Sequence, residues 1–233
     1  MKRAAAERAV EEYVEPGMVV GLGTGSTAYW AIRRIGALLS SGELREVRGV
    51  ATSTQTTAQA GEAGVPLVTL AQARPDLTLD GADEIDPYLN LIKGRGGALL
   101  REKIVAAAGG VMVVIADESK LVDPLGKGSV PVEVDPFGWE STVEALASLG
   151  CEAELRREPP EGPGSEPRPT DGGHYTVDCY FSRIDAPRVL EAEMKRIPGA
   201  LETGLFLGLC RAAVVGRGGP EDVEVREAGS PGP

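Results

Sequence analysis

Short apolar runs alternate with amphipathic segments over the first half of the chain, and this rhythm restricts the possible folds more than any other feature. We expect strands at 18–22, 47–51, 67–70, 77–79 and 111–115, and helices at 4–14, 28–39, 54–63 and 98–108. Strands separated by helices require right-handed crossovers, which give a mostly parallel sheet with helices on both faces. The sequence therefore predicts a Rossmann-like α/β unit.

The rhythm changes after Pro131. We expect strands at 132–134, 151–157 and 175–181, helices at 139–149 and 186–197, and a long loop rich in Pro and Gly at 158–173. This β-α-β-β-α order resembles the ferredoxin-like layout of small α+β domains. An apolar strand at 209–215 could rejoin the first sheet, followed by a short alternating piece at 223–226. We predict two domains, a Rossmann-like catalytic domain of residues 1–128 and 199–233 and a small α+β domain of residues 129–198.

Charge and composition exclude several classes of function. The chain has 35 acidic and 24 basic residues, a net charge of −11, so nucleic acid and anionic membranes are poor partners. It lacks a long apolar run and an N-terminal signal sequence, and we expect it in the cytoplasm. The three cysteines are far apart and His174 is the only histidine, which argues against a disulfide framework and a Cys- or His-based metal site.

A glycine-rich loop, Gly21-Leu22-Gly23-Thr24-Gly25-Ser26-Thr27, lies between an expected strand and an expected helix. Glycines allow close backbone approach, and a helix N-terminus presents free N–H groups to an anion. Ser26 stands where a dinucleotide fingerprint has its third glycine, and the Gly-Lys-Ser/Thr of a P-loop is absent. The loop predicts a cradle for a small phosphate monoester. The alternative is a plain turn in which Ser26 or Thr27 caps the helix.

Four carboxylates crowd into the seven residues from Asp80 to Asp86. Such charges repel each other unless a cation, a lysine or sugar hydroxyls share the space, or unless the loop is simply solvated. The nearby run Lys93-Gly94-Arg95-Gly96-Gly97 places cations beside glycines, where they can approach a ligand. Lys93 could equally form a neutralising salt bridge with Asp80 or Asp83.

Two further residues are candidates for chemistry. In the helix expected at 98–108, Glu102 shares a face with Ala98, Leu99, Val105 and Ala106. A carboxylate on an apolar face is partly desolvated, which raises its pKa as a general base requires, unless it reaches water at the helix edge. Lys120 follows the strand at 111–115 and could supply a point charge to a phosphate, or belong to a solvated turn.

The motifs GLGTGST, TSTQTT, LDGADEID, KGRGGALLREK and DESK occur in an order and spacing that resemble the type A ribose-5-phosphate isomerase family. Asp171-Gly172-Gly173, Asp178 and the segment 201–206 agree with this resemblance. It implies interconversion of ribose 5-phosphate and ribulose 5-phosphate in the pentose phosphate pathway, through an enediolate. It also implies that no metal or organic cofactor is needed, and that the protein is a homodimer or homotetramer.

The resemblance also implies roles for individual residues. Glu102 would be the proton acceptor, Lys93 would stabilise the enediolate, Asp80 would assist ring opening and Asp83 would relay hydroxyl protons. The sugar phosphate would be bound by the loops that contain Thr24, Gly25, Ser26, Thr27, Gly81, Ala82, Gly94, Arg95, Gly96 and Lys120. The sequence departs from the family at His174, where an asparagine is expected, and at Arg3, where many members have a lysine.

Other classes of protein compete with this interpretation. The same kind of fold serves as a phosphosugar-sensing domain without catalysis, but a sensor would need a DNA-binding module, and no basic helix-turn-helix is evident. A nicotinamide oxidoreductase fits the fold but not the glycine loop. A hydrolase built on His174 and Asp171 would need a serine elbow, which the sequence lacks.

Overall fold

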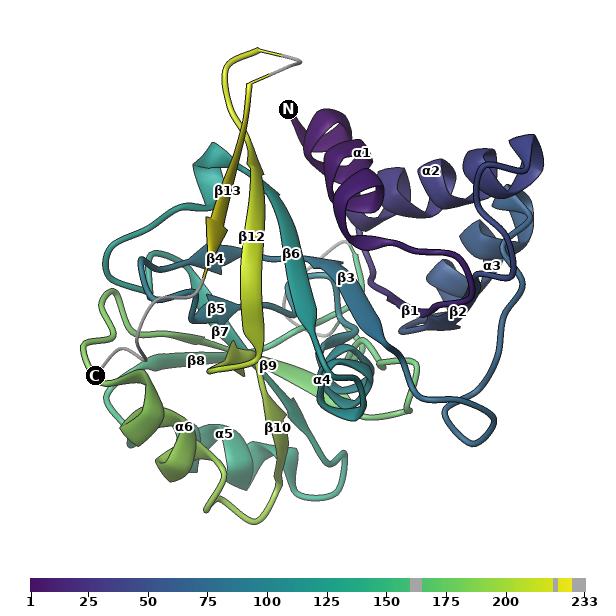
Figure 1. Ribbon diagram of the computed structural model, residues 1–233. Helices are drawn as coiled ribbons and strands as arrows, with labels where there is room; N and C mark the ends of the chain where they lie inside the picture. Colours follow the sequence, from purple (N-terminus) through teal and green to yellow (C-terminus); the bar gives the residue numbers. More distant parts are fainter. Residues whose placement is uncertain (160–164, 220–221, 228–233) are drawn as a thin grey trace.

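The computed structural model describes residues 1–159, 165–219 and 222–227. Its largest sheet has six strands in the order β13-β12-β6-β3-β1-β2 (Figure 1). They are β1 (Val19–Leu22), β2 (Arg48–Ala51), β3 (Leu77–Gly81), β6 (Met112–Asp117), β12 (Cys210–Gly216) and β13 (Val223–Glu227). All neighbours are parallel except β12 and β13. The prediction of a mostly parallel Rossmann-like sheet is confirmed, as is the return of the C-terminal strand to it.

Both faces of this sheet are covered because successive side chains of the central strands β1, β3 and β6, which point to opposite faces, are buried. Val113 and Ile115 of β6 pack in a core with the helices α1 (Lys2–Tyr13), α2 (Ala28–Ser41) and α3 (Thr54–Ala63). Val114, on the opposite face, packs in a second core with Ala106 of α4 (Leu99–Ala108) and Phe206. Phe206 belongs to a three-stranded sheet of β4 (Glu84–Ile85), β5 (Leu91–Ile92) and β11 (Leu205–Phe206). We call the six-stranded sheet, the helices α1 to α4 and this three-stranded sheet the large unit.

The remaining elements form a four-stranded antiparallel sheet with two helices, which we call the small unit. It contains β7 (Ser129–Val134), α5 (Trp139–Ala147), β8 (Glu152–Leu155), β9 (Tyr175–Tyr180), α6 (Pro187–Met194) and β10 (Ala200–Thr203). The strand order β10-β7-β9-β8 and the β-α-β-β-α-β succession confirm the ferredoxin-like layout. The domain boundary at residue 198 stays a prediction, and β10, just beyond it, pairs with β7.

One expected strand was wrong. Residues 67–70 make no strand, and Leu67 forms only an isolated bridge to Gly49. The backbone bonds to Gly49 end at Val68, and the chain then enters a turn in which the Gln72 side chain accepts hydrogen bonds from the N–H and hydroxyl of Thr69. The loop expected at 158–173 is described only in part, since 160–164 lie outside the described residues.

The strand order places the functional crevice. From β1 the chain passes to β2 on one side, and β3 pairs with β1 on the other side. Ligands of open α/β sheets bind at such a switch point, beyond the carboxyl ends of the strands. The loops that follow β1 and β3 are the glycine-rich and acidic motifs. In the described part of the chain, no helix is long and apolar enough to span a membrane.

Candidate active site

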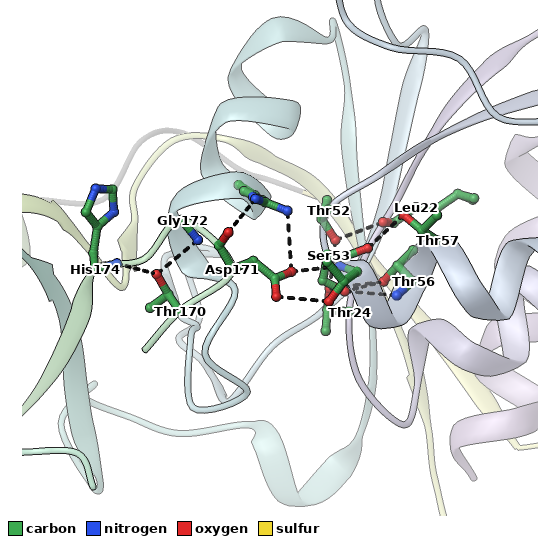
Figure 2. A network of polar contacts seen from close by, with 12 residues as sticks. Leu22, Thr24, Thr52, Ser53, Thr56, Thr57, Thr170, Asp171, Gly172 and His174 are labelled. Atoms are coloured by element: carbon green, nitrogen blue, oxygen red, sulfur yellow. Dashed lines mark hydrogen bonds and ion pairs between the residues drawn. The ribbon is translucent and has the colours of Figure 1, made fainter. Parts of the chain in front are cut away.

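A cluster of buried hydroxyls supports the loop after β1 (Figure 2). The Thr24 hydroxyl lies 2.8 Å from those of Thr52 and Ser53 and 3.1 Å from that of Thr56. Thr56 donates to the carbonyl of Gly23 at 2.9 Å, which fixes the backbone of the loop. Ser53 caps α3 by accepting from the Thr56 N–H at 3.0 Å. The TSTQTT motif therefore shapes the glycine-rich loop.

The end of this loop presents unused donors at the start of α2. Thr27 occupies the N-cap position, but its side chain makes no capping hydrogen bond. Ser26 accepts a hydrogen bond of 3.0 Å from Lys2 Nζ. The alternative of a plain capped turn is therefore wrong for this loop. Hydroxyls, a lysine and a helix N-terminus meet here, a combination suited to a phosphate.

The four acidic residues between Asp80, near the end of β3, and Asp86 have different hydrogen-bond partners. Asp80 Oδ1 accepts from the N–H groups of Gly81 at 2.7 Å and Thr24 at 3.2 Å. Glu84 accepts from the backbone of residues 126–128 and from Arg95, and Asp86 accepts from Asn90. Asp83 Oδ2 accepts from the Arg95 N–H at 3.0 Å. The alternative of a solvated loop is wrong, because Asp80, Glu84 and Asp86 are buried.

Lys93 links the acidic loop to α4. Its Nζ lies 3.0 Å from Asp80 Oδ2 and 3.2 Å from Glu102 Oε2, and it donates to the Gly81 carbonyl at 2.5 Å. Lys93, Asp80 and Glu102 are at most 4% exposed. Burial alone would lower the pKa of Lys93, but the charges of Asp80 and Glu102 raise it above its ordinary value. Lys93 is therefore a permanent cation.

The buried position of Glu102 strongly perturbs its pKa. Burial and then the charge of Asp80 raise its pKa to about 8, against the opposing effect of Lys93. Burial likewise raises the pKa of Asp80, although Lys93 and backbone N–H groups oppose it. One ammonium cannot neutralise two carboxylates, so the pair resists full ionisation. A carboxyl with such a pKa suits proton transfer near neutral pH.

These groups surround one pocket. Its lining residues come from the loop after β1, from the end of β3 and the loop that follows it, from the loop before α4, from the first turns of α1 and α4, and from the segment after β6. They are Lys2, Thr24, Gly25, Ser26, Thr27, Gly81, Ala82, Asp83, Lys93, Gly94, Gly96, Glu102 and Lys120. The structure thus brings together nearly all of the predicted site residues. Asp80 lies behind Lys93 and Gly81 rather than on the pocket wall.

Arg95 is the predicted residue whose side chain the structure places elsewhere. Its guanidinium binds Glu84 at 2.7 Å and lies against Gly128. Only its backbone N–H, which donates to Asp83, takes part in the site. Glu84 is buried and needs a cation, which explains the direction of the Arg95 side chain.

Lys2 is the pocket residue that sequence reasoning missed. Arg3, the position that the family resemblance singled out, instead pairs with Glu7 at 2.8 Å and lies over the ring of Trp30. The two residues are neighbours at the start of α1, and the direction of the helix decides which one faces Ser26. A lysine within one residue of the expected position was the available signal.

A second pocket adjoins the first, and the small unit closes it. Thr24 and Gly96 line both pockets, and Arg156 and Asp171 come from the small unit. Figure 2 shows Asp171 pointing toward the hydroxyl cluster. It accepts from the N–H of Thr54 at 2.7 Å and its hydroxyl at 2.9 Å. His174 binds Glu133 at 2.9 Å, so His174 and Asp171 have different partners and form no hydrolase pair.

Known proteins are similar to this chain over most of its length. The family model for ribose 5-phosphate isomerase A (phosphoriboisomerase A) matches residues 48–219. The chain is 52% identical to a ribose-5-phosphate isomerase A of Gloeobacter violaceus over 218 residues, 92% of this chain and 91% of the relative. It is 45% identical to one of Thermococcus kodakarensis over 229 residues, 97% of each chain.

Solved structures are similar along almost the whole chain. A ribose 5-phosphate isomerase from Plasmodium falciparum has a TM-score of 0.91 and 38% identity, covering 97% of each chain. A D-ribose-5-phosphate isomerase in complex with phospho-erythronic acid has a TM-score of 0.90 and 41% identity, again covering 97% of each chain. None of these similarities supports a sensor without catalysis.

Proposed function

Because this chain belongs to the ribose 5-phosphate isomerase A family and interconverts ribose 5-phosphate and ribulose 5-phosphate, we propose that Glu102 is its general base. The family places this reaction in the pentose phosphate pathway. Aldose and ketose differ in the position of one carbon-bound proton, which moves between C2 and C1 through an enediolate. The observation that carries the proposal is the buried contact of Glu102 with Lys93, which sets a carboxyl of raised pKa beside a fixed cation.

Glu102 acts in its ionised form. The carboxylate takes the proton from C2 of the open-chain aldose, which leaves an enediolate and a neutral carboxylic acid. The acid then returns the proton to C1 while the O2 hydroxyl proton passes to O1, relayed by Asp83, and the ketose forms. A pKa of about 8 makes the carboxylate a stronger base than an exposed glutamate.

Lys93 stabilises the negative charge that develops on O1 and O2. Its ammonium is held by Asp80, Glu102 and the Gly81 carbonyl, so it does not have to reorganise during the reaction. A cation that is fixed in a buried site stabilises a developing oxyanion far more strongly than one in water.

The two aspartates handle the hydroxyl protons. Asp80, whose pKa is raised by burial, lies behind the pocket wall and assists opening of the furanose ring through Lys93, whose Nζ it contacts at 3.0 Å. Asp83 lines the pocket and orients the sugar hydroxyls, while the Arg95 N–H holds its carboxylate in place. Neither role requires a metal ion or an organic cofactor.

The phosphate binds at the start of α2. Ser26 and Thr27 offer hydroxyls and backbone N–H groups, Lys2 donates to Ser26, and Lys120 lines the same pocket. The positive end of the helix dipole adds to the attraction for a dianion. This arrangement fixes the end of the sugar away from the carbons that react.

The test is incubation with ribose 5-phosphate in deuterated water without added metal, with ketose formation and label position read together. Glu102→Gln is expected to abolish exchange of the C2 hydrogen while substrate still binds. Glu62→Gln changes an exposed glutamate of α3 and serves as the matched control, with full activity expected. Exchange retained in Glu102→Gln would remove this residue from the mechanism.

We also propose that the protein works in the cytoplasm and that it is a homodimer or homotetramer, the assembly that the family resemblance implies. Size-exclusion chromatography with light scattering tests the assembly. A monomer at assay concentration with full activity would contradict it.

A further inference from the structure

Arg156 belongs to the small unit but contacts the loop that carries Lys93. It follows β8, and its Nη1 donates to the carbonyls of Gly94 and Arg95, both at 3.2 Å. These carbonyls lie in the segment 93–98 between β5 and α4, which we call the catalytic loop. We propose that Arg156 is a positioning residue for the isomerase reaction, holding the catalytic loop in the conformation that the sugar requires. This inference rests on the proposed function.

The guanidinium is itself held in one orientation. Its Nε and Nη2 donate to Asp178 at 2.9 and 2.7 Å, and Asp178 also accepts from the Ser129 hydroxyl at 2.9 Å. The side chains of Arg156 and Asp178 are each 14% exposed. A two-point contact between a planar guanidinium and a carboxylate fixes the plane of both groups. Asp178 therefore fixes the orientation of the guanidinium, with Nη1 directed toward the catalytic loop.

The two carbonyl contacts also fix the direction of the N–H group in each of the two peptides. In a trans peptide the carbonyl and the following N–H point in opposite directions. Because the Gly94 carbonyl accepts a hydrogen bond from Arg156, the Arg95 N–H points away from Arg156 and donates to Asp83 Oδ2 at 3.0 Å. Because the Arg95 carbonyl also accepts from Arg156, the N–H of Gly96 points away from Arg156 in the same way. Gly96 lines the pocket.

The catalytic loop needs such an anchor. Gly94 has a φ of +105° and Gly97 a φ of +84°, conformations that glycine adopts freely but also leaves freely. Lys93, at the start of the loop, must stay within 3.2 Å of both Asp80 and Glu102. Because Asp178 neutralises Arg156, the contribution of Arg156 is geometric and adds no net charge to the pocket.

Other contacts also join the two units, so their association does not depend on Arg156 alone. Asp171 binds Thr54 and also accepts from Arg101, whose Nη2 lies 2.7 Å from its carbonyl. Lys103 of α4 binds Glu202 of β10 at 2.9 Å. These contacts hold the small unit on the large unit when Arg156 is changed, and the effect of the change falls on the catalytic loop.

The experiment compares Arg156→Lys with the wild-type enzyme. Lysine keeps the charge but cannot bind Asp178 at two points and the two carbonyls together. We expect kcat to fall by about 100-fold, the size of effect that a misplacement of about 1 Å produces. The inhibition constant of inorganic phosphate, which reports the phosphate subsite, should stay within about twofold because that subsite has no contact with Arg156. Arg183→Lys, in the exposed Arg183–Asp185 pair of the small unit, is the matched control with unchanged kcat.

A second variant separates orientation from folding. Arg156→Ala leaves a gap beside the second pocket, which Arg156 lines, so a small cation can enter from solvent. Millimolar guanidinium should restore part of kcat, and methylammonium should not, because only guanidinium can bridge Asp178 and the two carbonyls. Circular dichroism and thermal unfolding are measured on both variants.

Several results would overturn the inference. They are a kcat of Arg156→Lys within about twofold of wild type, an equal loss of phosphate affinity, no rescue by guanidinium, or unfolding of both variants at the assay temperature. The Glu102 proposal is tested apart from these results. C2 exchange retained in Glu102→Gln removes the proposed base whatever Arg156 does, and an unchanged Arg156→Lys leaves the role of Glu102 standing.

Discussion

Lys93 Nζ lies 3.2 Å from Glu102 Oε2 in a position that solvent barely reaches. Lys93 begins the loop before α4 and Glu102 lies in the first turn of α4, while Asp80 of β3 contacts the same ammonium at 3.0 Å. This group therefore has two carboxyls and only one ammonium. That imbalance makes the pH dependence of the enzyme an informative test of the site.

The pH dependence of kcat/KM should report the titration of Glu102 in the free enzyme. Glu102 acts as the carboxylate, so kcat/KM should rise with pH through about 8, the value to which burial and Asp80 raise its pKa. Asp80→Asn removes the repelling charge, so the midpoint should move to lower pH even though activity falls. The measurement is kcat/KM from pH 5 to 10 for both proteins. A midpoint that does not move would separate Asp80 from the titration of Glu102.

The same group should make stability depend on pH. Its pKa is about 8 in the folded protein, against 4.5 for a free glutamate. The folded state therefore binds the proton more tightly, and this stabilisation is complete below about 4.5 and is lost as pH rises toward 8. Glu102→Gln should flatten the fall in the free energy of unfolding over this interval, as measured by urea titration. Glu62→Gln, on the surface, should keep the wild-type slope, and an equal slope in Glu102→Gln would contradict the assignment.

Lys2 should bind the phosphate rather than serve the chemistry. Lys2→Gln should raise KM roughly tenfold, the cost of one charge-assisted hydrogen bond, and leave kcat nearly unchanged. The effect should shrink at high salt because the Lys2 side chain is 41% exposed. Steady-state kinetics at two ionic strengths provide the measurement. Lys127→Gln, an exposed lysine outside the pocket, is the control. A fall in kcat with unchanged KM would assign Lys2 a different role.

Gly23 should tolerate no side chain. A Cβ at this position would overlap the Asp80 carboxylate, which backbone N–H groups and Lys93 hold in place. Gly23→Ala should lower the free energy of unfolding by about 1–3 kcal/mol and remove most activity. Gly61→Ala is the matched control. It lies in α3 with open space around its Cβ, and it should stabilise the protein by up to about 1 kcal/mol. Chemical denaturation of both variants distinguishes local overlap from a general cost of alanine.

Sequence reasoning worked best where the decisive neighbours are close along the chain. The helix at 54–63 was predicted with its observed bounds because its cap and its periodic positions lie within a few residues of one another. The same reasoning missed β4, β5 and β11, which have two residues each and exist only because they pair with one another. Strands this short carry no periodic pattern.

By itself, the sequence determined the alternation of strands and helices, the glycine loop, the acidic cluster and the placement of Glu102 on an apolar helix face. Each of these depends on residues that are neighbours within one turn or one strand. Only the tertiary structure decided that Lys2 rather than Arg3 faces Ser26, that the Arg95 side chain binds Glu84, and that Arg156 reaches the catalytic loop. These outcomes depend on how separate elements pack, because burial dictates which charges must find partners and from which side.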